Sequence, residues 1–145
     1  WMSYAKRQQK INKRNQKLSE KINGSNFQPL RYDFINSSAR ISLSSSASKL
    51  LLDVTSQYIG HNNGDLCCAY DGIMKPLGWR SEATLRKAIK ELQAAGILIL
   101  TRQGGRNKTP NLYALSCYPI DECGGKINCN PTNKATDEWK QFQKL

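Results

Sequence analysis

The stretch GWRSEATLRKAIKEL, residues 78–92, carries the strongest structural signal in this chain of 145 residues. Ser81 is suited to cap a helix, because its hydroxyl can accept a hydrogen bond from an unpaired N–H group of the first turn. Glu82 follows in that turn, where the helix dipole favours an acid. Gly96 is suited to end the helix, because glycine readily adopts positive φ. We therefore expect a helix that starts after Ser81 and stops before Gly96.

The predicted helix has two chemically different faces. At about 100° per residue, one stripe is apolar and consists of Leu85, Ala88, Ile89 and Leu92. The opposite side is largely basic and consists of Arg80, Ala83, Arg86, Lys87, Lys90 and Ala94. We expect the first face to pack on a core and the second to remain outside it.

A β-hairpin is predicted directly after this helix. Residues 97–102 form an apolar strand and residues 112–116 a second one. The loop between them, residues 103–110, is rich in glycine and basic side chains.

Another helix is predicted earlier in the chain. One of Ser44–Ser46 is its expected cap, and apolar side chains follow at helical spacing, namely Ala47, Leu50, Leu51, Val54 and Tyr58. We expect this helix to end near Gly60. The sequence HNNGD then predicts a turn, because Asn-Gly favours positive φ.

The segment between that turn and residue 78 predicts a very short strand at 66–68 and a short helix within 69–79. The helix is expected to point Ile73, Met74 and Leu77 inward, and Pro76 limits its length. Trp79 is interpreted as a core residue beneath the following turn.

Charge is concentrated in two parts of the chain. The whole sequence has 22 Lys+Arg and 11 Asp+Glu, a net charge of +11. Residues 1–22 carry +6 and residues 75–110 carry +6, whereas 23–74 sum to −1 and 111–145 to zero. Two basic blocks on a near-neutral background favour a polyanionic partner, because clustered cations displace the counterions of phosphates.

The outer segments give weaker signals. Residues 1–26 are polar and basic, and we expect a flexible arm there. The aromatic segment 27–41 is interpreted as a strap across the core. Residues 117–145 are expected to be an extension that ends in a short helix, with Trp139, Phe142 and Leu145 available for docking.

Several other classes of function find little support. One histidine leaves no His-based triad or His-rich metal motif, and GGKIN at 124–128 lacks the full spacing of a phosphate loop. We therefore expect no enzyme, no cofactor and no metal.

Cys117, Cys123 and Cys129 recur every six residues, unlike the paired ligands of structural zinc sites. No apolar run is long enough to span a membrane, and the odd number of cysteines favours a reducing compartment, the cytoplasm.

The order of these elements resembles a winged helix-turn-helix protein over about residues 44–116. The quoted helix with its Ser cap, followed by Gly96 and the hairpin, resembles small DNA-binding proteins of bacterial phages, plasmids and integrative elements. The resemblance implies an α+β, mainly helical fold with a three-helix core and a β-hairpin wing, spanning residues 27–116. It also implies that the basic helix enters the major groove of DNA while the wing touches backbone or minor groove.

The resemblance assigns candidate DNA contacts to three groups of residues. The recognition helix would contribute Arg80, Ser81, Ala83, Thr84, Arg86, Lys87 and Lys90. The wing would contribute Arg102, Gly104, Gly105, Arg106 and Lys108. Weaker candidates are Tyr70, Lys75, Lys6, Arg7, Lys10, Lys13 and Arg14.

Three biological roles remain open at this point. The first is a homodimeric transcriptional regulator of a mobile element, located in the bacterial cytoplasm or nucleoid and bound to double-stranded DNA. The second is a replication or partition initiator that binds origin repeats. The third is a winged-helix module that contacts proteins instead of DNA.

Overall fold

The computed structural model describes residues 3–22, 27–105 and 109–142, which fall into two units, Trp1–Leu30 and Arg31–Leu145. In the first unit, residues Tyr4–Ile22 form a 19-residue helix, α1. This secondary structure differs from the unordered arm that we expected. The physical reason is that no Gly or Pro interrupts residues 4–22, and Lys, Arg, Gln and Glu are good helix formers.

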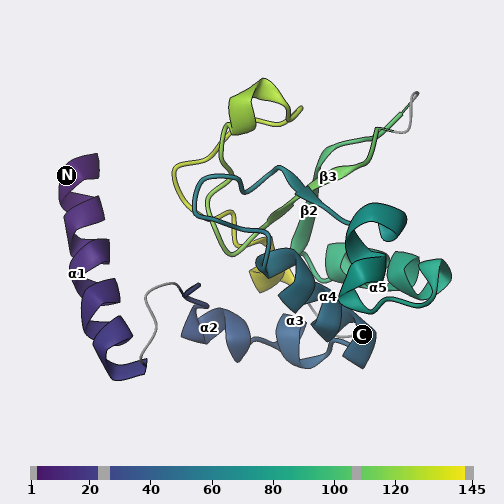
Figure 1. Ribbon diagram of the computed structural model, residues 1–145, viewed down its shortest axis with the longest axis horizontal. Coiled ribbons are helices and arrows are strands. Elements are labelled where there is room, and N and C mark those ends of the chain that lie inside the picture. Colours follow the sequence, from purple (N-terminus) through teal and green to yellow (C-terminus); the bar gives the residue numbers. More distant parts are fainter. Residues whose placement is uncertain (1–2, 23–26, 106–108, 143–145) are drawn as a thin grey trace. The chain divides into compact units, whose positions relative to one another are not determined.

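The second unit has an α+β fold, as expected (Figure 1). Its helices are α2 (Tyr32–Ile35), α3 (Ser38–Ile41), α4 (Ser45–Thr55) and α5 (Glu82–Ala94). Its strands are β1 (Leu66–Cys67), β2 (Leu98–Arg102) and β3 (Leu112–Leu115). They form one antiparallel sheet in the order β1-β3-β2. Strand β3 is central and pairs with β1 on one side and with β2, its hairpin partner, on the other.

The start of α4 is capped and tied to α5. The Ser44 hydroxyl accepts a hydrogen bond from the Ala47 backbone N–H at 3.2 Å. The same residue donates its backbone N–H and its hydroxyl to Oε2 of Glu91, at 3.1 and 2.8 Å. Leu50 and Val54 are fully buried. The predicted cap is confirmed, and so is the apolar face from Ala47 to Val54. The helix ends at Thr55, however, so the expected end near Gly60 was wrong and Tyr58 lies beyond the helix.

The segment between β1 and α5 is tighter than the single short helix that we predicted. It consists of a π-helical turn, η1 (Tyr70–Met74), and a 3-10 turn, η2 (Lys75–Leu77), followed by Gly78 at φ 94°. Met74 is fully buried, but Leu77 is 42% exposed, so the expectation that Leu77 points inward was wrong. Pro76 and the left-handed Gly78 end the helical path here, which places the Leu77 side chain outside the core.

The segment after residue 116 belongs to the same core. Trp139, in the 3-10 turn η5 (Glu138–Gln141), is 5% exposed, and its ring lies 5.4 Å from that of Phe34 in an edge contact. A Cβ atom on Gly96 would lie 2.7 Å from the Glu138 carbonyl oxygen. The docking role predicted for Trp139 is confirmed, and the structure groups this segment with the central fold instead of separating it as an extension. Leu145 lies outside the described residues.

Asn63 joins the predicted turn to this later segment. Its side chain is fully buried, and its amide donates to the carbonyl oxygens of Leu115 at 2.9 Å and Pro119 at 2.8 Å. Its Oδ1 accepts from the Leu115 N–H at 2.7 Å. The neighbouring Gly64 has φ 131°, in agreement with the turn predicted from HNNGD. This amide therefore fixes the end of β3 to the loop before β1.

Candidate nucleic-acid interface

Helix α5 is held in place by its cap and by its apolar stripe. The Ser81 hydroxyl accepts from the Thr84 N–H at 3.3 Å, as predicted. Leu85, Ala88 and Leu92 are buried, and α5 packs against α4 and against β2. Gly96 then turns the chain into the hairpin with φ 73°. The predicted orientation of this helix is therefore confirmed.

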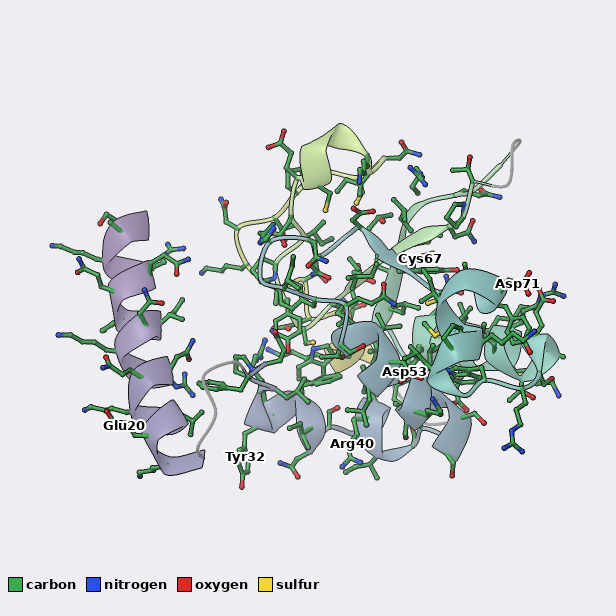
Figure 2. The ribbon with its side chains drawn as sticks, in the orientation of Figure 1. Glu20, Tyr32, Arg40, Asp53, Cys67 and Asp71 are labelled. Carbon is green, nitrogen blue, oxygen red and sulfur yellow. The ribbon has the colours of Figure 1, made fainter. Side chains whose placement is uncertain are left out.

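The turn before α5 is anchored to α4. Oδ2 of Asp53, labelled in Figure 2, accepts from Trp79 Nε1 and from Lys49 Nζ, each at 2.7 Å. The Lys49 ammonium also lies 5.2 Å from the centre of the Trp79 ring. Trp79 is 5% exposed, so its predicted place beneath the turn is confirmed. These contacts fix the turn that precedes α5 to the surface of α4.

The opposite face of α5 is exposed, as its sequence predicts. The exposed candidates on and just before the helix are Arg80, Ser81, Ala83, Thr84, Arg86, Lys87 and Lys90. Arg86 pairs with Glu82 at 3.0 Å, and the two side chains are 70% and 56% exposed. Such an exposed pair contributes at most about 1 kcal/mol, so a phosphate can replace the carboxylate.

The hairpin loop is shaped by contacts within itself. Gly104 donates its N–H to Oδ1 of Asn111 at 2.5 Å, and a Cβ atom at Gly104 would collide with the Thr109 carbonyl oxygen. Gly104 therefore allows the two sides of the loop to approach each other closely. Gly105 has open space around its Cα atom.

Arg102 is only partly available as a contact of the hairpin. Its Nη2 donates to the Pro110 carbonyl oxygen at 3.2 Å, while its Nε is buried without a hydrogen-bond partner among the described residues. Arg106 and Lys108, the other basic candidates of this loop, lie outside the described residues.

A hollow of about 630 Å³ lies between α5, η1 and the hairpin, where no sequence pattern predicted one. Its apolar lining includes Leu85, Ile89, Leu100 and Tyr113, and Arg86 and Lys90 also line it. A smaller hollow of about 230 Å³ lies at the start of α5, lined by Ser46, Lys49, Gly78, Trp79, Arg80, Ser81 and Thr84. Basic groups of α5 therefore border the larger hollow, whereas the smaller one is bordered by Arg80, just before α5, and by Lys49 of α4.

Burial controls the protonation of two groups beside the larger hollow. It raises the pKa of the Cys68 thiol to about 12 and also raises the pKa of the Tyr113 hydroxyl. Both groups stay protonated near neutral pH. The reactive thiolate form of Cys68 is therefore nearly absent there.

The weaker candidates fall on two different units. Tyr70 is half-buried and lines the larger hollow, while Lys75 is exposed on η2. Lys6, Arg7, Lys10, Lys13 and Arg14 are exposed on α1. The structure therefore brings Tyr70 alongside α5, and it places the five basic residues of the arm on a helix in the first unit.

The cysteine spacing does not produce a metal site within the described ranges. Cys117 is buried and its pKa is raised to about 12 by burial, while Cys123 and Cys129 are half-buried. Among residues 3–22, 27–105 and 109–142, no group of three or more His, Cys, Asp or Glu side chains could hold a metal ion. Within the same ranges, no helix combines the length and apolar character needed to cross a bilayer.

Comparisons of this chain with protein-family models, with curated proteins and with solved structures give no match.

Proposed function

We propose that this protein is a sequence-specific double-stranded DNA-binding protein of the winged helix-turn-helix type, with α5 as recognition helix and the β2–β3 hairpin as wing. The element order supports this proposal, because α4, β1, the η1–η2 turns, α5 and the hairpin follow one another along the chain. The antiparallel sheet in the order β1-β3-β2 is compatible with such a fold.

The observation that carries the proposal is the exposed basic face of α5 opposite its buried stripe. A helix with its side chains is about 10–12 Å wide, and the major groove of B-DNA is about 12 Å wide. Lys87 and Lys90 are exposed on this face while Leu85 and Leu92 hold the other face in the core. The helix can therefore enter a groove without losing its packing.

Each candidate residue has a role that follows from its chemistry. Arg86 suits a bidentate contact with O6 and N7 of guanine, and Ala83 suits contact with a thymine methyl group. Lys87, Lys90 and Arg80 suit phosphates at the groove edges. Ser81 and Thr84 border the smaller hollow at the start of α5, where their hydroxyls can donate to a phosphate.

We further propose that the protein acts as a homodimeric transcriptional regulator of a mobile element in the bacterial cytoplasm, without a catalytic step. A two-fold dimer requires an inverted repeat in its target. Footprinting on DNA selected from a random pool tests this role. Tandem repeats in an AT-rich origin would instead indicate a replication initiator.

The binding proposal is tested by salt-dependent titration of the selected duplex. Arg86→Ala together with Lys87→Ala is expected to weaken binding, and each lost phosphate contact reduces the slope of log K against log salt by about one. Lys134→Ala serves as a matched control for Lys87→Ala, because Lys134 is also exposed but belongs to neither α5 nor the hairpin. Unchanged binding in the double variant, or no duplex binding by the wild type, would reject the proposal.

A further inference from the structure

Helix α1 carries a narrow stripe of side chains at the spacing of a coiled coil. Ile11 and Leu18 are seven residues apart and therefore lie on one side of the helix, with exposed fractions of 48% and 41%. Asn15 lies between them, and it is half-buried whereas the other described side chains of α1 are exposed. With Gln8, these residues follow the alternating four-three spacing of heptad positions a and d.

The charges on α1 are arranged around this stripe in an ordered way. If Gln8 and Asn15 are a positions and Ile11 and Leu18 are d positions, the g positions hold three basic residues, Arg7, Arg14 and Lys21. The e positions Ala5 and Asn12 are neutral. In a parallel pair of helices g faces e, so the cations oppose neutral residues. In an antiparallel pair g faces g, so cations oppose cations.

We propose that α1 is an interaction surface for a second copy of this chain, which it binds as a parallel, in-register helix pair. The position of Asn15 indicates that the partner at this surface is a second copy of the same helix. An Asn at an a position of such a pair meets the same Asn of the partner, where each side-chain amide can donate to the carbonyl of the other. An apolar partner surface would instead leave this amide without a hydrogen bond.

Charge makes this association sensitive to salt. Each α1 carries seven basic residues and one acid, Glu20, labelled in Figure 2. Two helices side by side repel each other within the Debye length, which is about 10 Å at 0.1 M salt and about 3 Å at 1 M. Apolar contacts at Ile11 and Leu18 oppose this repulsion. Added salt therefore strengthens the pairing of α1, whereas it weakens binding to DNA.

Sedimentation equilibrium of the full chain without DNA, at 0.1 and 1 M salt, tests the proposal. The wild type is expected to dimerise about tenfold more tightly at the higher salt concentration. Ile11→Lys combined with Leu18→Lys should remain monomeric at both. Gln9→Lys is the matched control for Ile11→Lys, because it adds the same charge to α1 outside the stripe and should dimerise like the wild type. A monomeric wild type at 1 M salt, or dimers of the double variant, would overturn the proposal.

Helix direction is tested with Leu18→Cys. In the parallel pair the two introduced thiols face each other and form a disulfide, which peptide mapping distinguishes from the native cysteines. In an antiparallel pair centred on the stripe they lie roughly 15 Å apart, given 1.5 Å per residue, and cannot bond. Since these experiments contain no DNA, their failure is distinguishable from failure of the proposed function. Only the link between this dimer and a two-fold DNA site rests on that function.

Discussion

Helices α1 and α5 are both basic, but they differ in what holds them. In α5, Leu85, Ala88 and Leu92 are buried, and the basic residues occupy the remaining face. In α1, the described side chains are exposed except for half-buried Asn15. The core orients the cations of α5, whereas those of α1 are arranged by its own heptad spacing. A basic composition alone therefore does not define an interface. Packing on a core, or contact with a partner, is also needed, because it determines which face of the helix is exposed.

The largest expected effect is the difference between the two helices in how much a Leu→Ala substitution lowers the free energy of unfolding. Leu92→Ala on α5 should lower the free energy of unfolding by about 2–5 kcal/mol, because it leaves a cavity at a fully buried site. Leu18→Ala on α1 should change it by less than about 0.5 kcal/mol, since Leu18 is 41% exposed. Urea unfolding followed by the fluorescence of the buried Trp79 and Trp139 measures both. Equal losses would contradict the comparison.

Alkaline pH should weaken the core that supports α5. Burial raises the pKa of the Cys68 and Cys117 thiols from 9.0 to about 12, so between these values the folded state holds protons that the unfolded state has lost. Stability therefore falls as pH rises through this range, by about 1 kcal/mol per thiol at pH 10. Urea unfolding at pH 8 and pH 10 checks this, with Cys68→Ala and Cys117→Ala each expected to reduce the difference. A pH-independent midpoint for unfolding would contradict it.

The smallest expected effect on stability concerns the exposed face of α5. Glu82→Gln removes the ion pair with Arg86 and the acid from the first turn of α5, and should lower the free energy of unfolding by about 0.5–1 kcal/mol. Affinity for duplex DNA should nevertheless increase, because one negative charge near the phosphates is lost and Arg86 is released. Titration of the selected duplex at constant salt tests this. Weaker binding would mean that Glu82 positions Arg86 for contact.

Local signals in the sequence were sufficient for α5. Capping by Ser81, the stripe of Leu85 and Leu92, and the positive φ of Gly96 all depend on neighbouring residues, and the structure has all three. The hairpin strands were predicted for the same reason. Residues 4–22 are helical where we expected a flexible arm, because the helix propensity of their Lys, Arg, Gln and Glu residues prevails over their low apolar content.

Contacts between distant segments were not predictable. The turn around Asn63 was expected, but the backbone partners of its side chain are more than 50 residues away in the sequence. The hydrogen bonds from Ser44 to Glu91 and from Trp79 to Asp53 likewise join segments that are distant in the sequence. The hollow beside α5 depends on how η1 and the hairpin meet that helix, which no local pattern encodes.

The edge contact between Phe34 and Trp139 has a consequence for synthesis of the protein on the ribosome. These rings belong to one core, yet 105 positions separate them along the chain. A nascent chain that has exposed α5 and the hairpin still lacks Trp139, and the Phe34 side of its core remains open to water. Folding of this unit is therefore completed only after residue 139 has left the exit tunnel. Until then, the core that carries α5 and its exposed basic face is not fully packed.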